Sequence, residues 1–169
     1  MVKFSIMKKL LILVLFILTT SNVMAKKVVK VGDTIAVNYI GSLKDGRVFD
    51  HNIGKNDLIF TVGDGKMIKP FEDAFIGMKK GEEKTIDILA KDAYGEFDEA
   101  KVFSIPAEQL PKDGKVGDTL KYRIGGGFYP VRIVYIGEKE VFIDANPKLA
   151  GKDLNFKITL LDIVEKVKN

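Results

Sequence analysis

The stretch from Leu58 to Ile88 reads LIFTVGDGKMIKPFEDAFIGMKKGEEKTIDI, and its three-part pattern decides the fold. Apolar side chains alternate over Leu58–Val62 and again over Lys84–Ile88, as strands with one buried face require. Between these strands, Pro70 suits the first turn of a helix and Gly77 suits its end. We therefore expect a strand, one short helix and a second strand, with the helix lying across a sheet.

The expected helix has one apolar side. Ile68, Phe71, Phe75 and Met78 recur at helical spacing and form a single stripe. A single amphipathic helix that covers a curved antiparallel sheet leaves a concave apolar groove between helix and sheet. We expect the functional site in that groove.

Residues 1–25 have the layout of a secretory signal peptide. Lys3, Lys8 and Lys9 precede the apolar run Leu10–Leu18, and the segment ends in the small residue Ala25. The run is too short for an ordinary membrane span. We expect cleavage, a periplasmic or other extracytoplasmic location, and no stable membrane insertion afterwards. The alternative is an uncleaved membrane anchor.

The charge of the remaining chain is nearly balanced. The full chain carries a net charge of +4, and without the three lysines of the leader it has 24 basic and 23 acidic residues, a net charge of +1. The high isoelectric point therefore mostly reflects the leader, and nucleic acid is not an expected partner.

The residue inventory excludes several chemistries. The chain has no cysteine, which excludes disulfides, zinc–thiolate sites and thiol catalysis. His51 is the single histidine, so a multi-histidine metal site is excluded as well. We expect no metal and no cofactor, and we expect His51 to be an exposed loop residue rather than a catalytic base.

Further strand patterns lie on both sides of the opening stretch. Before it, alternation over Ile35–Ile40 and the extended Val48–Asp50 indicate two strands, and Leu154–Val164 indicates a long final strand in the middle of the same sheet. Between Ala100 and Ala145 at least three more strands are indicated. Because long connections without structure are uncommon, we expect a small inserted domain at 99–145 within a discontinuous domain at 26–98 and 146–169.

Five short motifs follow one another along the chain: Tyr39-Ile40-Gly41, Val48-Phe49-Asp50, the run Phe60–Phe71, Asp92-Ala93-Tyr94-Gly95, and Leu149-Ala150-Gly151-Lys152 with Phe156. Their order resembles the FKBP-type peptidyl-prolyl isomerases. The interruption between the fourth and fifth motifs resembles the SlyD-like subfamily, in which the flap of the isomerase carries an inserted chaperone domain. The resemblance implies an α+β fold: an antiparallel half-barrel sheet wrapped on one short helix, with a small inserted mostly-β domain.

The same resemblance implies the positions of the site residues. The implied catalytic pocket consists of Tyr39, Phe49, Asp50, Met67, Ile68, Phe71, Tyr94 and Phe156. The resemblance also implies that Leu58 lines the pocket and binds substrate. We further expect substrate binding at Leu149 and, from the excess of apolar residues in the insert, at Phe103, Ile105, Tyr122, Val131 and Ile133.

Four features depart from the family pattern. Phe71 stands where many members have tryptophan, and Leu58 stands where some have an aromatic residue. Asn146-Pro147-Lys148 lacks the histidine that usually follows this asparagine, and the sequence has no histidine- and cysteine-rich metal-binding tail. The first two changes keep the pocket apolar but alter its depth.

Each of these residues also has a purely structural interpretation. Aromatic side chains on a small sheet are often core residues, and buried tyrosine hydroxyls need a hydrogen-bond partner in any case. Asp50 could equally be a turn residue. The resemblance favours the functional interpretation for Phe49, Phe71 and Asp50.

We therefore expect a peptidyl-prolyl cis-trans isomerase and folding chaperone that acts as a monomer on unfolded or proline-containing polypeptides. The insert has many apolar residues for so small a core, so some should stay exposed and bind clients, for example by strand addition at a sheet edge. Two alternatives remain open: a binding module of this fold without isomerase activity, and a holdase chaperone in which the prolyl pocket is secondary.

Overall fold

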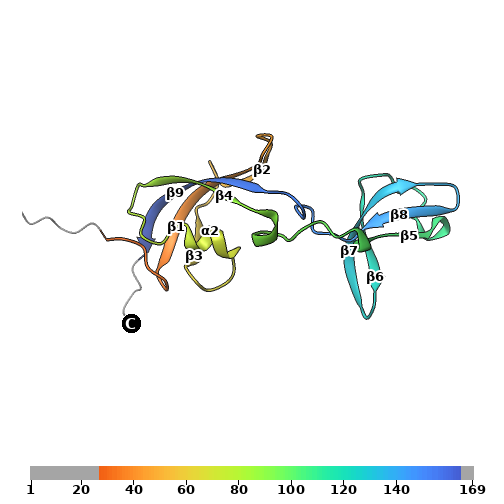
Figure 1. Cartoon of the computed structure of the whole chain (residues 1–169), viewed down its shortest axis with the longest axis horizontal. Coiled ribbons are helices and arrows are strands. Elements are labelled where there is room, and N and C mark those ends of the chain that lie inside the picture. Colours follow the sequence, from red (N-terminus) through yellow and green to blue (C-terminus); the bar gives the residue numbers. More distant parts are fainter. Residues whose placement is uncertain (1–26, 165–169) are drawn as a thin grey trace, which may run out of the picture.

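The chain forms two antiparallel sheets, each with its own buried core. The structure is a computed structural model that describes residues 27–164, so the predicted leader at 1–25 lies outside the described residues. Figure 1 shows the two sheets lying one beyond the other along the longest axis, joined by two segments of chain.

The first sheet has five strands, and all of its strand pairs are antiparallel. The strand order is β2-β1-β9-β4, and β3 also pairs with β1. The final strand therefore lies in the middle of this sheet, as its alternation predicted. The expected antiparallel sheet with one short helix is confirmed. The strand bounds are β1 Thr34–Leu43, β2 Val48–His51, β3 Leu58–Thr61, β4 Glu83–Ile88 and β9 Leu154–Val164.

The helix of the first sheet, α2, is shorter than its sequence pattern predicted. It spans Lys69–Asp73 with Pro70 in its first turn, and the chain then continues to Gly77 in tighter turns. In these turns the amides donate to carbonyls three residues earlier, at 3.0–3.2 Å. The apolar stripe survives this change, because the tighter turns still direct three of its members inward: Phe71, Phe75 and Met78 are buried.

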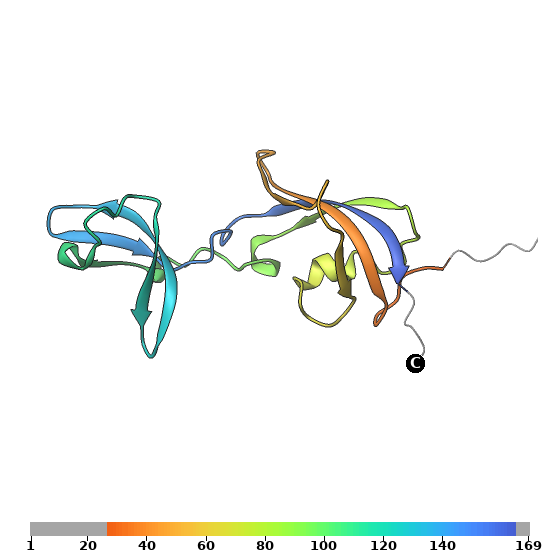
Figure 2. The ribbon, with the colours of Figure 1, turned by 180° about the vertical axis from the view of Figure 1, so that it is seen from behind.

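The main core lies between the hollow side of the first sheet and α2, which Figure 2 shows beneath the strands. Apolar side chains from β1, β4 and β9 face the helix and the turns that follow it. The core side chains with almost no exposed surface include Ile35, Val37, Phe75, Ile88, Leu154, Ile158 and Leu160.

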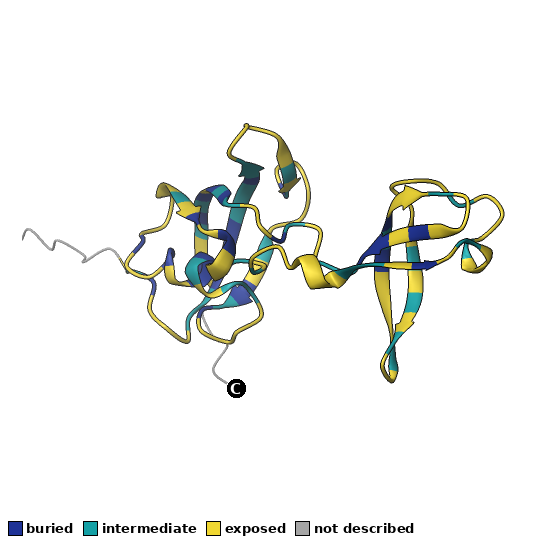
Figure 3. Cartoon of the chain, turned by 45° about the vertical axis from the view of Figure 1, so that its right-hand side comes forward, coloured by how far each residue is buried: buried dark blue, intermediate teal, exposed yellow. Residues whose placement is uncertain are grey.

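The second sheet has four strands in the order β5-β8-β7-β6. The sequence predicted at least three strands here, and the predicted bounds 99–145 enclose all four. Figure 3 shows that buried residues are confined to the centre of this sheet, whereas the β6–β7 hairpin is exposed toward its tip. The strand bounds are β5 Val102–Pro106, β6 Thr119–Ile124, β7 Gly127–Ile136 and β8 Glu140–Asp144.

Strand β7 contains a β-bulge that changes which side chains face outward. Its register with β8 shifts between Ile133 and Tyr135, so one extra residue is inserted in the strand. Strict alternation would have placed Tyr135 on the buried face with Val131 and Ile133. The bulge instead pairs Tyr135 with Phe142, and both side chains are exposed.

Two connecting segments, 93–101 and 145–153, join the sheets and run side by side (Figures 1 and 2). The amide of Gly151 donates to the carbonyl of Gly95 at 2.8 Å, close to the first sheet. Short 3₁₀ turns occur at Ala90–Asp92, Glu99–Lys101 and Ala107–Gln109. Among residues 27–164, neither α2 nor these short turns combine the length and apolar character needed to cross a membrane.

Candidate functional site

Four aromatic rings from four different elements meet at the hollow side of the first sheet. Phe156 of β9 contacts the other three rings, and its ring centroid lies 5.1 Å from that of Phe71 on α2 and 6.3 Å from that of Tyr39 on β1. Phe49 of β2 completes the group, with its ring edge-on to Phe156 at 5.6 Å. The resemblance placed all four of these residues in one pocket, and the structure brings them together.

Tyr39 carries the polar group of this aromatic cluster. Its hydroxyl donates to the Asp50 carboxylate with an Oη–Oδ2 distance of 2.7 Å. Burial raises the pKa of Tyr39 to about 12, and the hydrogen bond to Asp50 and the charges of Asp50 and Tyr94 add to the rise. At neutral pH the phenol is therefore protonated and acts as a donor. Asp50 is more than a turn residue, because it holds this hydroxyl.

The remaining predicted pocket residues surround the aromatic cluster. Leu58, Met67, Ile68 and Leu149 are half-buried and pack against the same core. Tyr94 is 45% exposed on the segment that leaves the first sheet, near enough to Tyr39 to influence its ionisation. Its side chain therefore belongs to the rim of the site rather than to its floor.

Asn52 supports the site, although its sequence pattern predicted only a loop residue. Its side chain is buried, accepts the amide of Tyr39 at 2.8 Å and donates to the carbonyl of Val37 at 3.0 Å. Asn52 thereby ties the loop after β2 to β1 at the position of Tyr39. The available signal was a lone asparagine directly after a short strand, which on its own does not indicate burial.

Gly41 is a second supporting residue that was quoted in a motif but not assigned a role. It is buried in β1, and a Cβ atom there would lie 2.7 Å from Phe49 Cζ and 2.9 Å from Phe156 Cε1. Only a residue without a side chain allows these two rings to approach β1 so closely. Glycine at this position therefore sets the depth of the aromatic cluster.

His51 differs from its prediction as an exposed loop residue. It is the last residue of β2 and is half-buried. Its Nδ1 atom is buried and has no hydrogen-bond partner among residues 27–164. A ring nitrogen without a partner provides no relay for proton transfer, so this geometry does not favour a catalytic base.

In the insert, the residues predicted to bind clients are mostly not the ones exposed to solvent. Ile105, Val131 and Ile133 are the core of the second sheet, and Phe103 and Tyr122 pack half-buried against it. We predicted that these three core residues contact clients. Their burial corrects that prediction, because almost none of their surface is exposed. Four aromatic residues of β7 and β8 are exposed instead: Phe128, Tyr129, Tyr135 and Phe142. Tyr135 and Phe142 contact each other, and we call this pair the aromatic patch.

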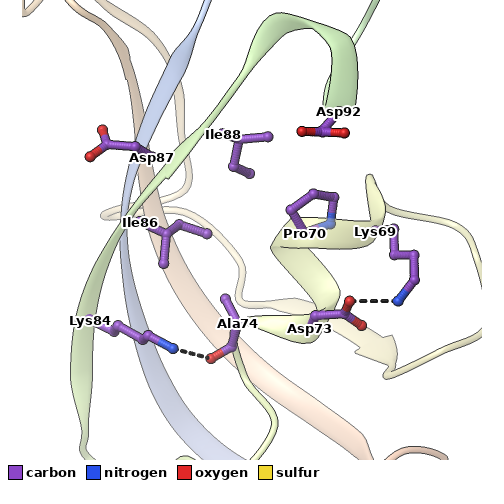
Figure 4. A pocket seen from close by; sticks show the side chains of 9 residues that line it. All are labelled: Lys69, Pro70, Asp73, Ala74, Lys84, Ile86, Asp87, Ile88 and Asp92. Atoms are coloured by element: carbon purple, nitrogen blue, oxygen red, sulfur yellow. Dashed lines mark hydrogen bonds and ion pairs between the residues drawn. The ribbon is translucent and has the colours of Figure 1, made fainter.

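A shallow groove of about 510 Å³ lies between α2 and β4, outside the aromatic cluster. Figure 4 shows its apolar floor, which includes Pro70, Ile86 and Ile88. Two lysines line it, and both have partners: Lys69 pairs with Asp73, and Lys84 donates to the carbonyl of Ala74 at 3.3 Å. We expected the functional site in a groove between helix and sheet. None of the predicted site residues lines this groove.

Among residues 27–164, no group of three or more histidine, cysteine, aspartate and glutamate side chains is arranged to hold a metal ion. The aromatic cluster offers one phenol, one carboxylate and an apolar surface. Such an arrangement can bind a small apolar group and remove it from water, while its one phenol proton is donated to Asp50 and the carboxylate can accept a further hydrogen bond. It contains no activated nucleophile and no general acid–base pair.

Comparison with known proteins agrees with this arrangement. Residues 25–161 match the family described as FKBP-type peptidyl-prolyl cis-trans isomerase. The chain is 34% identical over 155 residues to the short-type peptidyl-prolyl cis-trans isomerase of Methanocaldococcus jannaschii, which covers 80% of this chain and 94% of that protein. It is 30% identical over 132 residues to the FKBP-type peptidyl-prolyl cis-trans isomerase SlyD of Aeromonas hydrophila, covering 76% of this chain and 61% of that protein.

A shorter match extends to a different kind of relative. Over 75 residues the chain is 41% identical to trigger factor of Francisella tularensis, which covers 44% of this chain and 17% of that protein.

Proposed function

This chain belongs to the FKBP-type peptidyl-prolyl cis-trans isomerases, and we propose that it isomerises prolyl bonds of unfolded polypeptides in the aromatic cluster around Phe156 while its insert holds the client. The proline ring would enter between the rings of Tyr39, Phe49, Phe71 and Phe156. Leu58, Met67, Ile68, Tyr94 and Leu149 would contact the flanking residues of the client.

The chemistry of prolyl isomerisation suits an apolar pocket. Rotation about the prolyl amide crosses a barrier of about 20 kcal/mol, because the planar amide has resonance and charge separation. A twisted amide loses much of that charge separation, so removal from water penalises the planar ground state more than the transition state. A pocket that binds the twisted form preferentially therefore accelerates rotation. Lowering the barrier by about 4 kcal/mol corresponds to a rate increase of roughly a thousandfold.

One observation carries this proposal: aromatic rings from three separate elements, those of Tyr39, Phe49 and Phe71, converge on Phe156 of β9. Their ring centroids lie 5.1–6.3 Å from that of Phe156. A fold needs a core, but it does not need a phenol–carboxylate pair, Tyr39 and Asp50, at the edge of that core. The pair fixes a polar edge beside the apolar surface, and the Asp50 carboxylate could accept a hydrogen bond from a backbone amide of the client.

The test is cis-to-trans kinetics on a short Xaa-Pro peptide. Phe156→Ala and Tyr94→Ala should lower kcat/KM at least about tenfold, which corresponds to about 1.4 kcal/mol of lost transition-state stabilisation. Asn155→Ala is the matched control, because Asn155 lies on β9 beside Phe156 but bonds Asp87. Wild-type activity no greater than that of the Phe156→Ala variant would favour the non-catalytic binding module.

A chaperone role for the insert is supported by the aromatic patch and by Phe128 on β7. Phe128 is 70% exposed, and Tyr135 and Phe142 form an edge-on pair with centroids 6.1 Å apart on the outer face. Exposed aromatic clusters on small domains are typical of binding surfaces. The edge strands β5 and β6 could also accept an added client strand, which would read backbone rather than sequence.

Replacing residues 99–145 by a short Gly-Ser connection tests that role. Short-peptide isomerisation should stay within about an order of magnitude, because the aromatic cluster lies in the first sheet. Catalysed refolding of a proline-limited protein should slow far more, since the client loses its tether and its raised local concentration. An equal loss in both assays would reduce the insert to a scaffold for the pocket.

We also propose that the working protein begins near Lys26 outside the cytoplasm, as the leader-like pattern of residues 1–25 predicts. Mass spectrometry of the protein purified from its native host provides the measurement. An intact N-terminus in the soluble cytoplasmic fraction would overturn the proposal.

A further inference from the structure

A polar network centred on Asn146 links the two connecting segments at the base of the insert. The side-chain amide of Asn146 donates to the carbonyl of Asp98 at 2.9 Å, and its oxygen accepts the amide of Asp98 at 3.0 Å. The side chain of Asn146 thus forms hydrogen bonds with both the backbone amide and the backbone carbonyl of Asp98, on the opposite segment. This is the pattern that a paired residue in a β-ladder would make with its backbone.

The position of this pair explains why a side chain is used. Regular pairing of β5 with β8 begins at Val102 and Asp144, and the amide of Ala145 still donates to the carbonyl of Lys101 at 2.9 Å. Below that point the 3₁₀ turn Glu99–Lys101 carries one segment out of register. A backbone rung cannot form there, and the carboxamide of Asn146, with one donor and one acceptor, replaces it.

The network continues from Asn146 into the core of the insert. Asp144 is only 3% exposed, and its Oδ1 accepts both the backbone amide and the side-chain amide of Asn146 at 2.8 Å. Its Oδ2 accepts Nη2 of Arg132 on β7 at 2.7 Å. A buried carboxylate is stable only when it is fully hydrogen-bonded, so these donors are held in place. Asn146 therefore connects β7, β8 and both segments.

A second, independent rung lies nearer the pocket. The amide of Gly151 donates to Gly95 between the same two segments, directly beside Tyr94 and close to Leu149. This backbone contact does not involve Asn146. The rim of the prolyl site and the base of the insert are consequently fixed by different contacts, and one can be removed without the other.

We infer that Asn146 is a positioning residue that holds the insert at a fixed orientation to the prolyl site, so that a client bound on the insert presents its prolines to that site. The inference rests on the proposed function of the insert. Without the Asn146 rung the two segments act as flexible linkers below Ala145, and the client samples many orientations. The effective concentration of its prolines at the pocket then falls.

The experiment compares Asn146→Ala with Asn155→Ala in the full chain. Asn155 is a matched control, because its amide also donates across the chain, to Asp87 at 2.9 Å, but within the first sheet. Asn146→Ala should leave kcat/KM for a short Xaa-Pro peptide within about twofold and raise KM for a proline-limited refolding protein about fivefold, with kcat unchanged. Residual dipolar couplings should show that the two sheets no longer share one alignment. Asn155→Ala should change none of these quantities.

Several outcomes would overturn the inference. A preserved common alignment of the two sheets in Asn146→Ala would do so, and so would an equal loss in the peptide and refolding assays. If Asn146→Ala does not fold, Asn146→Ser keeps a short polar group without adding a charge beside the Asp144 carboxylate, and it should show a smaller rise in KM. An unchanged KM in that variant would also count against the inference.

The proposed function and this inference fail in distinguishable ways. If replacement of residues 99–145 leaves catalysed refolding intact, the insert holds no client and the proposed function is wrong. If that replacement slows refolding but Asn146→Ala does not, the insert works without a fixed orientation, and only the role of Asn146 is lost.

Discussion

At Tyr39 a hydroxyl group and an aromatic ring serve the same site in different ways. The ring packs against Phe71 and Phe156, while the hydroxyl reaches Asp50 at the edge of the cluster. Prolyl rotation needs no proton transfer, so the site requires only that Tyr39 stay protonated. Its raised pKa ensures this over the whole physiological range.

The rate of peptide isomerisation should therefore hardly depend on pH. We expect kcat/KM to be flat between about pH 5 and 9, and His51→Ala to leave it nearly unchanged. Stopped-flow kinetics on an Xaa-Pro peptide across this range provide the measurement. A bell-shaped profile near the reference histidine pKa of about 6.5 that disappears in His51→Ala would contradict a desolvation mechanism.

Stability, in contrast, should depend on Tyr39 at alkaline pH. The folded pKa of about 12 lies above the unfolded value of about 10, so folding favours the protonated phenol. Its contribution is complete below pH 10 and is lost as the pH rises through 12. Urea unfolding from pH 8 to 11.5 should show a steeper alkaline loss of unfolding free energy in wild type than in Tyr39→Phe. Parallel curves would mean that the phenol is not coupled to folding.

Gly41 should be intolerant of even one methyl group. Gly41→Ala places a Cβ within 3 Å of both Phe49 and Phe156, so the rings must move apart. We expect kcat/KM on a short peptide to fall about tenfold or more, a loss of about 1.4 kcal/mol in transition-state stabilisation. Gly126→Ala is the control, because its Cβ would meet no atom within 4 Å. Equal activities of the two variants would show that the ring positions are unimportant.

At this scale the sequence predicted aromatic residues better than polar ones. The order of motifs predicted that Tyr39, Phe49, Phe71 and Phe156 lie together, because the spacing and aromatic character of these positions match the family pattern. The burial of Asn52 could not be predicted, since its partners are backbone groups whose positions depend on the fold.

Among the elements, α2 is anchored by the buried carboxylate of one of its own residues, Glu72. Glu72 is 3% exposed, and its two oxygens accept the amides of Gly63 and Met67 at 3.0 and 3.2 Å. These bonds close the turn between β3 and α2 and hold Met67 at the site. A buried carboxylate with two converging donors cannot be replaced by an amide, whose nitrogen would face one of the donors.

Glu72→Gln should accordingly destabilise the protein by about 1–3 kcal/mol, the usual cost of leaving a buried polar group without a partner. Urea unfolding provides the measurement. Glu82→Gln is a matched control, because Glu82 also accepts a backbone amide, that of Lys79 at 3.0 Å, but in an exposed turn. A loss at Glu72 no larger than that at Glu82 would contradict the role of Glu72.

The strands were predicted more reliably than the faces they present. Alternation located β1, β4, β7 and β9, since period two is a local property of the sequence. The bulge in β7 is set by pairing with β8, which no local pattern encodes, and it turns Tyr135 outward. The same limitation led to the choice of Ile105, Val131 and Ile133 as client-binding residues.

In the whole molecule, the two cores differ in size. Fifteen buried residues form the core of the first sheet, and five form that of the second. Small cores provide little stability, so the insert should open more often than the isomerase sheet. Hydrogen exchange followed by mass spectrometry should show faster exchange of amides in β6 and β7 than in β1 and β9. Equal protection in both sheets would mean that they unfold as one unit.

The central position of β9 has a consequence for the order in which the chain is made. A ribosome releases β1 and β4 long before β9, so the first sheet lacks its middle strand, and the prolyl site lacks Phe156, until residues 154–164 have emerged. The strands of the insert are complete by Asp144, and they pair only with one another. Translation therefore allows the insert to fold first and delays completion of the larger sheet.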